Sequence, residues 1–331
     1  MPSLITTRRT LLRTGTAAGL TLAAPSIVRA QGAWPNKPIT IVVNFPAGGL
    51  TDGIARAFGQ HVSQATGQQV LIDNKPGASG NIGAAMVART PADGYTFLHS
   101  VSSTLIQNRV LFKTLGFDPD KDFTIVSGTP SGVLPVVVHK SVPVTNLKDF
   151  IGYARDHKVN FGSWALGSSA HIFAQALNEK YGLKMEIVTY KGEAPMWQDM
   201  GAGSLQAAMG SPQAMNALLV KGDIRGIVAP SKVRASQLPD VPTSREQGFD
   251  DDSFTFWGWL ALAAPAATPK EIVKKMSDLW VAGAESEPGR KMMQGFGLVE
   301  KPLNHEEVMV DYEKQKGILI PRVQALGLKP E

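Results

Sequence analysis

Four short turns rich in glycine and serine carry the residues of this chain that are best suited to bind a ligand. They occupy residues 46–52, 76–81, 100–103 and 163–169. Glycine lets a backbone approach a ligand closely, and serine adds a hydroxyl donor. A helix that begins in such a turn also presents unpaired N–H groups and the positive end of its dipole. This combination favours binding of a carboxylate without an arginine.

We expect the turns to meet around one ligand, because the strand-to-helix turns of an open parallel sheet gather at one edge. One such turn alone is explained by strand termination and helix capping; four of them favour a site. Asp52 has the alternative role of complementing a helix dipole, and Tyr190 that of a core aromatic. The candidate ligand-binding residues are Pro46, Ala47, Gly48, Gly49, Asp52, Ser79, Gly80, Asn81, Ser102, Ser103, Ser163, Trp164, Ser168, Ser169, Tyr190 and Gly192.

Signatures of enzymes, cofactors and metals are missing from the sequence. It contains no Gly-x-Ser-x-Gly elbow, no His-Glu-x-x-His and no Walker loop. There is no cysteine, and the six histidines show no metal-ligand spacing. We therefore expect no cofactor and no metal. An exported α/β hydrolase with His171 beside Ser168 or Ser169 is the weaker alternative, because no third triad member is evident.

Alternating apolar segments and helical spacings predict the elements that hold the turns. The expected strands are 38–45, 70–72, 95–98, 123–126, 134–138, 160–163, 186–190, 205–209, 224–228 and 254–262. The expected helices are 54–65, 81–88, one from 104, 147–157, 170–181, 196–200, and a helical tail from 269. Strands that alternate with helices indicate an α/β fold with mainly parallel sheets.

The α/β pattern restarts near the middle of the chain, which indicates two lobes. We expect residues 31–128 plus 255–331 to form lobe 1 and residues 129–254 to form lobe 2. Segments near 125–135 and 254–262 would cross between them, and a ligand would bind in the cleft between the lobes.

The first thirty residues have the pattern of an export signal. The pair Arg8-Arg9 precedes a weakly apolar stretch, and Val28-Arg29-Ala30 resembles a small-residue cleavage site. These features predict a twin-arginine signal peptide over 1–30 that is cleaved after Ala30, and so a periplasmic protein. Four of the 33 basic residues lie in this segment, so 29 basic residues face 28 acidic ones in the remainder. A near-neutral chain does not predict nucleic-acid binding.

A set of short motifs, in a fixed order, resembles one known family. The motifs are Pro35-Asn36-Lys37-Pro38-Ile39, Phe45-Pro46-Ala47-Gly48-Gly49 with Asp52 and Arg56, Asn74-Lys75-Pro76-Gly77-Ala78-Ser79-Gly80 with Gly83, Asp93-Gly94-Tyr95-Thr96, Ser168-Ser169-Ala170-His171, Tyr190-Lys191-Gly192 with Pro195, Leu238-Pro239-Asp240-Val241-Pro242-Thr243, Trp257, and the segment from Ala264-Pro265 to Pro269. Over nearly all of the chain beyond the export signal, the sequence resembles the substrate-binding receptors of tripartite tricarboxylate transporters, the Bug family.

The resemblance implies a two-lobed type II periplasmic binding fold whose cleft closes on a ligand. It implies capture of a di- or tricarboxylate, an amino acid or an aromatic acid, with the carboxylate held by backbone groups and waters at the first two turns. The protein would be a monomer and would deliver the ligand to integral-membrane transporter subunits. A ligand-sensing partner of a signalling system remains the alternative.

The sequence departs from the resembled family after Ser163, where small residues are common and this chain has Trp164-Ala165-Leu166. Two interpretations of Trp164 are open. Its indole could stack on an aromatic ligand in the cleft, or it could pack under its own turn as a core residue.

Overall fold

The computed structural model describes residues 34–250, 254, 258–325, 327, 328 and 330. The expected export signal over 1–30 and Trp257 lie outside the described residues. Residues Pro35–Glu331 form one compact unit, to which the following description applies.

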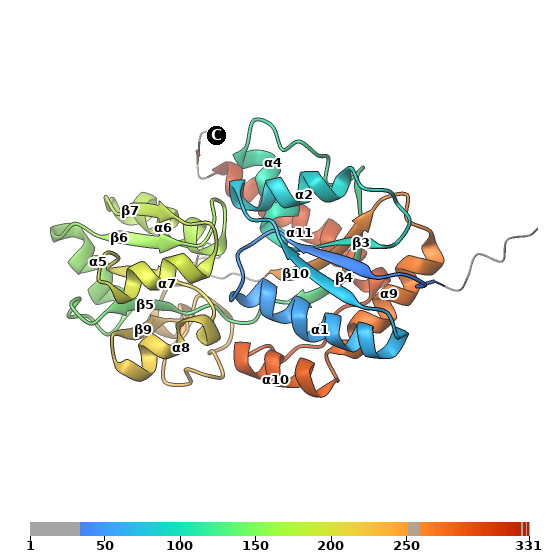
Figure 1. Cartoon of the computed structure of the whole chain (residues 1–331). Coiled ribbons are helices and arrows are strands. Elements are labelled where there is room, and N and C mark those ends of the chain that lie inside the picture. The colour runs from blue at the N-terminus through green and yellow to red at the C-terminus, as the bar shows by residue number, and fades with distance from the viewer. Residues whose placement is uncertain (1–33, 251–253, 255–257, 326, 329, 331) are drawn as a thin grey trace, which may run out of the picture. The chain divides into compact units, whose positions relative to one another are not determined.

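Two five-stranded sheets organise the described part of this unit (Figure 1). The first sheet has the order β2 (Val70–Asn74), β1 (Ile39–Val43), β3 (Thr96–Val101), β10 (Trp259–Pro265) and β4 (Phe123–Pro130). The second has the order β7 (Glu186–Thr189), β6 (Asn160–Ser163), β8 (Ala207–Met209), β5 (Val136–His139) and β9 (Ile224–Val228). Two mainly parallel sheets flanked by helices confirm the predicted fold class.

One strand in each sheet runs against the others, and chain crossing explains both cases. β10 is antiparallel to β3 and β4, and β5 is antiparallel to β8 and β9. β5 follows β4 of the first sheet, and β10 follows β9 of the second sheet. A strand that arrives from the other sheet enters at the edge where its new neighbours end, so it runs in the opposite direction. β5 and β10 therefore each begin at the carboxyl edge of the sheet that they enter.

Helices cover both faces of each sheet. They are α1 (Leu50–Thr66), α2 (Asn81–Ala88), α3 (Ser102–Leu105), α4 (Asn108–Leu111), α5 (Leu147–Asp156), α6 (Ser169–Tyr181), α7 (Glu193–Gly201), α8 (Pro212–Lys221), α9 (Lys270–Gly283), α10 (Glu287–Phe296) and α11 (His305–Ala325). On the first sheet, α2 and α11 share one core cluster, while α1 and α9 contact each other through Phe58 and Trp280. The C-terminal helix thus belongs to the first sheet.

The second sheet is buried on both faces, as the continuous apolar run of β5 predicts. Val136 and Val138 belong to the core cluster with α5 and α6. Val137, between them, belongs to the cluster with α7 and α8. Successive side chains of a strand point to opposite faces, so these three residues divide between the two clusters.

Long-range pairing changes several of the expected boundaries. The turn expected at 100–103 is wrong for its first half, because Ser100 and Val101 still pair with β10 and extend β3. The strand expected over 254–262 begins only at Trp259, and Phe254 lies in the core of the second sheet. The sequence interpretation missed α8, although Pro212 at its first position and Gly222 after its end are typical helix boundaries. The expected lobe boundary at 128/129 falls inside β4.

Candidate ligand-binding site

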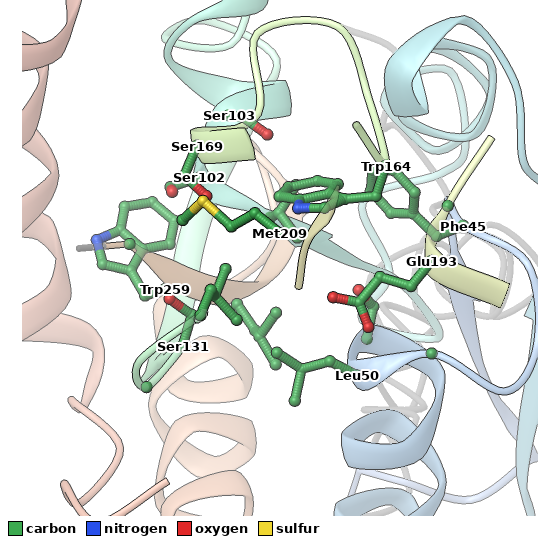
Figure 2. A pocket seen from close by; sticks show the side chains of 18 of the residues that line it. Phe45, Leu50, Ser102, Ser103, Ser131, Trp164, Ser169, Glu193, Met209 and Trp259 are labelled. Atoms are coloured by element: carbon green, nitrogen blue, oxygen red, sulfur yellow. The ribbon is translucent and has the colours of Figure 1, made fainter. Parts of the chain in front are cut away.

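A pocket of about 90 Å³ opens where strand ends of the two sheets meet (Figure 2). A volume of roughly 10–15 Å³ holds one water by this measure, so the pocket has room for a small molecule. The first sheet and its helices contribute Phe45, Pro46, Gly49, Leu50, Thr51, Val101, Ser102, Ser103, Gln107, Ser131, Gly132, Gly258, Trp259, Leu260 and Leu319. The second contributes Leu134, Trp164, Ser169, Gly192, Glu193, Met209 and Pro230.

The position of the pocket follows from strand direction. Phe45 follows β1, Val101 ends β3 and Ser131 follows β4 in the first sheet. Trp164 follows β6 and Met209 ends β8 in the second. Ligand sites of open α/β sheets lie outside the carboxyl ends of parallel strands, which is where both sheets direct these residues.

Seven of the sixteen candidate residues named from the sequence line this pocket. They are Pro46, Gly49, Ser102, Ser103, Trp164, Ser169 and Gly192. They come from the first, third and fourth turns and from the segment after β7, so the structure brings together residues that lie far apart in sequence. The other nine lie outside the lining, and most of them hold the lining residues in place.

Asp52 fixes the first turn from behind the pocket. Its carboxylate accepts hydrogen bonds from the Gly48 N–H at 3.1 Å and from Asn74 Nδ2 at 3.0 Å, and it pairs with Arg56 at 2.9 Å. Burial opposes ionisation, but the hydrogen bonds from Arg56, Gly48 and Asn74 outweigh it and hold the pKa of Asp52 below its usual value. Gly48 and its neighbour Ala47 are exposed. Gly48 has a φ of +91°, which favours glycine.

The second turn is used for packing between segments. Ser79 Oγ accepts a hydrogen bond from the Leu166 N–H at 3.0 Å, which joins the second turn to the fourth. Gly80 has a φ of +91°, and a Cβ there would lie 2.4 Å from Asn44 Nδ2, so the position excludes any side chain. Asn81 Oδ1 accepts from Asn108 Nδ2 at 2.7 Å. None of these three residues lines the pocket.

The fourth turn is fixed by its own serines. Ser163 and Ser168 are fully buried and share a hydrogen bond of 2.9 Å between their hydroxyls. Ser168 also caps α6 by accepting from the His171 N–H. The His171 ring accepts from the Gly167 N–H through Nδ1 at 3.2 Å. The ring is thus engaged with backbone, and the contacts of the Ser168 hydroxyl are structural.

Tyr190 does not line the pocket. Its hydroxyl donates to Asp199 Oδ2 at 2.6 Å, and its ring packs among the residues between the second sheet and α7. Burial and the Asp199 carboxylate raise the pKa of Tyr190 well above its ordinary value. Tyr190 therefore has the alternative role, that of a core aromatic.

Trp164 has contacts that fit both interpretations of its role. Its ring packs edge-on against Phe45 of the first turn, with the ring centres 5.9 Å apart, and it also adjoins two core clusters of the second sheet. The same ring lines the pocket (Figure 2). Its indole Nε1 is buried and has no hydrogen-bond partner in the described part of the chain. A buried donor without a partner is costly.

The described lining combines apolar walls with neutral hydrogen-bond donors. Phe45, Leu50, Leu134, Met209 and Trp259 form much of the wall. The hydroxyls are those of Thr51, Ser102, Ser103, Ser131 and Ser169. Helix α1 begins at the pocket with Gly49 as its N-cap, and no side chain caps it. No lysine, arginine or histidine lines the pocket among the residues that the structure describes.

The sequence analysis missed several lining residues, of which Glu193, Ser131 and Met209 matter most. Met209 ends the expected strand 205–209. Ser131 lies beyond the expected strand 123–126, which in the structure continues to Pro130. Glu193 directly follows the candidate Gly192 and begins α7.

Hydrogen bonds join segments that belong to the first sheet and to the second. Ser79 accepts from Leu166, and Gln107 Nε2 donates to the Gly167 carbonyl at 3.2 Å. On another side, Gln237 Nε2 donates to the Gln294 carbonyl at 2.8 Å. The two halves of the unit are therefore joined by direct contacts.

The fold and the pocket are those of an extracytoplasmic solute-binding protein. The sequence matches the tripartite tricarboxylate transporter family receptor over residues 54–314, and the chain belongs to this family. This finding confirms the resemblance drawn from the motifs. The family consists of periplasmic solute-binding receptors, not of enzymes.

Curated relatives and solved structures agree with this assignment. The UPF0065 protein in the tcbD-tcbE intergenic region of Pseudomonas sp. strain P51 is 33% identical over 78% of each chain. BugT of Bordetella pertussis is 31% identical over 72% of this chain and 74% of its own. The solved structure of R. palustris Rpa4515 with adipate has a TM-score of 0.84 at 32% identity and covers 90% of this chain and all of its own. MatC from Rhodopseudomonas palustris with bound malate has a TM-score of 0.78 at 26% identity and covers 87% of this chain and 99% of its own.

Two other kinds of feature are absent from the described residues. No helix there combines the length and apolar character needed to cross a membrane. No group of three or more histidine, cysteine or acidic side chains there could hold a metal ion.

Proposed function

We propose that this protein captures a small carboxylate-bearing molecule in the pocket between its two sheets and delivers it to the integral-membrane subunits of a tripartite tricarboxylate-type transporter. The observation that carries the proposal is the meeting of uncapped α1, at Gly49, with the hydroxyls of Ser102, Ser103 and Ser169 in one pocket. Helix N-termini and hydroxyls bind carboxylates without a fixed positive charge.

Ligands of related structures support a carboxylate. Rpa4515 was solved with adipate and MatC with malate. In this chain the ligand's carboxylate would contact the donors at Gly49, Thr51 and the pocket serines, and its body would lie along the apolar wall. Ala47, Gly48 and Asp52 would act by fixing the first turn, and Ser79, Gly80, Asn81, Ser163 and Ser168 by fixing the segments around it.

A thermal-shift screen of the purified protein against a library of carboxylates tests the proposal. A ligand that binds only the folded state stabilises it by about 2.7 kcal/mol at a concentration one hundred times its Kd. We expect at least one carboxylate to raise the melting temperature and to be recovered unchanged by NMR after incubation. Absence of any stabilising carboxylate would contradict the proposed ligand class, and its conversion would contradict a binding role.

Replacing Gly49 with valine is expected to weaken binding at least about tenfold while the protein still folds. A Cβ at Gly49 would meet no atom within 4 Å, so the fold has room for a side chain. That room belongs to the pocket, where a valine would block the approach of the ligand to the start of α1. Calorimetric titration measures the loss.

Gly152→Val is the matched control for this substitution. Gly152 lies on the exposed side of α5, and a Cβ there also meets nothing within 4 Å. If a folded Gly49→Val protein binds the ligand as tightly as the Gly152→Val control does, the first turn is not part of the site.

We also propose that the protein reaches the periplasm by the twin-arginine route and acts there as a monomer. The Arg8-Arg9 pair, which lies outside the described residues, supports the route. Replacing both arginines with lysine is expected to leave unprocessed precursor in the cytoplasm, because this route depends on the arginine pair. Cell fractionation and the mass of the N-terminus measure the result. Normal periplasmic accumulation with cleavage after Ala30 would rule out the twin-arginine route.

A further inference from the structure

The pocket contains a single ionisable side chain among the described residues that line it, and this side chain is acidic. Glu193 contributes a carboxylate, and the other lining residues are neutral. Figure 2 shows this carboxylate projecting into the space between Trp164 and Leu50. A pocket that receives a carboxylate ligand thus contains a fixed acceptor for a different group.

The backbone holds Glu193 at the boundary between the two halves of the unit. It is the first residue of α7, after Gly192, whose φ of +119° favours glycine. A Cβ at Gly192 would lie 2.6 Å from Pro46 Cδ, so the segment contacts the first turn directly. Glu193 therefore lies close to the start of α1, where the ligand's carboxylate would bind.

Neutral partners fix the orientation of the carboxylate. Glu193 Oε1 accepts from the Ser211 N–H at 2.8 Å, and Oε2 makes a short hydrogen bond with the Ser211 hydroxyl. Ser211 is the N-cap of α8. Two helices, α7 and α8, therefore begin at this carboxylate, and their dipoles favour a negative charge there.

No cation in the described part of the chain neutralises Glu193. Its polar neighbours are neutral: Ser211 donates two hydrogen bonds, the Trp197 side chain also favours the charged form, and no arginine, lysine or histidine acts on it. Burial raises the pKa of Glu193 above its usual value, and the neutral partners Ser211 and Trp197 offset this only in part. A ligand that brings a positive hydrogen-bond donor would supply the missing partner, and a ligand that brings a second carboxylate would be repelled.

We propose that Glu193 determines the ligand class, and that the protein selects a carboxylate that also carries an amino group on an apolar body over di- and tricarboxylates. The inference rests on the proposed capture of a carboxylate and narrows it. The ammonium group of the ligand would donate to Glu193. Its carboxylate would accept hydrogen bonds from the start of α1 and from the pocket serines, and its apolar body would contact Trp164 and Met209. If Glu193 served only to cap α8, the protein would show no preference among these ligands.

Two sets of three matched compounds test the selection by calorimetric titration. The aliphatic set is 6-aminohexanoate, adipate and hexanoate, and the aromatic set is phenylalanine, benzylmalonate and 3-phenylpropionate. Within each set only the group that would face Glu193 changes. It changes from aminomethyl to carboxylate to methyl in the aliphatic set, and from ammonium to carboxylate to hydrogen in the aromatic set. We expect the aminated member of the set that fits the pocket to bind at least about tenfold more tightly than its dicarboxylate counterpart.

Glu193→Gln removes the charge and keeps an oxygen that can accept from the Ser211 N–H. We expect this variant to lose about tenfold or more in affinity for the aminated compound and to bind the dicarboxylate more tightly than the parent protein does. Glu193→Asp keeps the charge and should retain part of the preference. Glu186→Gln, on exposed β7, makes the same change in net charge outside the pocket and should leave the preference unchanged.

The results separate this inference from the function on which it rests. A parent protein that prefers adipate or benzylmalonate overturns the role of Glu193 but leaves a carboxylate receptor. A preference for amines that persists in Glu193→Gln also overturns it. If no compound of either set binds and no carboxylate of the thermal-shift screen binds, both proposals are wrong. If the only carboxylates that bind lack an amino group, the selection by Glu193 is wrong but the carboxylate receptor stands.

Discussion

Lowering the pH from 7 to 4 is expected to remove about 6 kcal/mol from the free energy of unfolding, through two buried histidines. Burial lowers the pKa of His99 to about 4 and the pKa of His171 to about 4, from 6.5. The folded state therefore keeps both rings neutral, while the unfolded chain protonates them near pH 6.5. Their contribution is complete above pH 6.5 and declines as the pH falls toward 4, by about 3 kcal/mol for each ring.

The contacts of the two rings explain why their charging disturbs the site. His99 Nδ1 lies 3.0 Å from the Thr51 carbonyl, so this nitrogen carries the proton, and the ring adjoins Trp280. His171 Nδ1 accepts from the Gly167 N–H, a bond that protonation removes. Thr51 lines the pocket and Gly167 belongs to its fourth turn. Acid should thus weaken ligand binding before it unfolds the protein.

Urea unfolding between pH 7 and pH 4 measures this effect. His99→Gln and His171→Gln should each reduce the pH dependence by about half, whatever their effect on stability at pH 7. Removing both should leave a nearly flat profile down to about pH 4.5. A parent protein whose unfolding free energy is constant over this range would show that neither ring is held neutral.

Replacing Trp164 with alanine is expected to reduce ligand affinity by about 2 kcal/mol, roughly thirtyfold. The ring lines the pocket and its indole Nε1 is a buried donor without a partner in the described residues. The substitution would remove a flat apolar surface and this donor together. Calorimetric titration with one aromatic and one aliphatic carboxylate measures the loss for each.

Trp164→Phe separates the two contributions. Phenylalanine keeps a flat ring against Phe45 and the ligand but has no N–H, so we expect it to restore most of the affinity for an aromatic carboxylate. A larger loss for the aromatic ligand than for the aliphatic one in Trp164→Ala supports stacking. Equal small losses with a lower melting temperature would show that Trp164 only packs under its own turn.

The fold could be predicted from sequence because its signals are local. The strand ending at Ser163, the helix capped by Ser168 and the helix stopped by Gly67 each depend on a few neighbouring residues. A strand over 254–262 was predicted, but the start of β10 at Trp259 and its reversed direction were not, because both depend on pairing with β3 and β4. Strand pairing between distant segments has no local signal.

The candidate site was only partly predictable for a related reason. Ser79 and Gly80 look like ligand residues in the sequence, yet Ser79 bonds to Leu166, and Asn44 fills the space beside Gly80. Glu193 looks like an ordinary acid in a first helical turn, yet the approach of Gly192 to Pro46 places it in the pocket. A turn's composition predicts that it can bind a ligand, while packing between distant segments decides whether it faces one.

The most direct test of the account is calorimetric titration of the protein with the best carboxylate of the thermal-shift screen and with the corresponding neutral amide. The amide keeps the shape and removes the negative charge that the start of α1 and the pocket serines would bind. We predict one ligand per chain and an affinity for the carboxylate at least about tenfold above that for the amide, since hydrogen bonds to charged groups are the stronger ones. Equal affinities, or more than one ligand per chain, would contradict recognition of a carboxylate in this pocket.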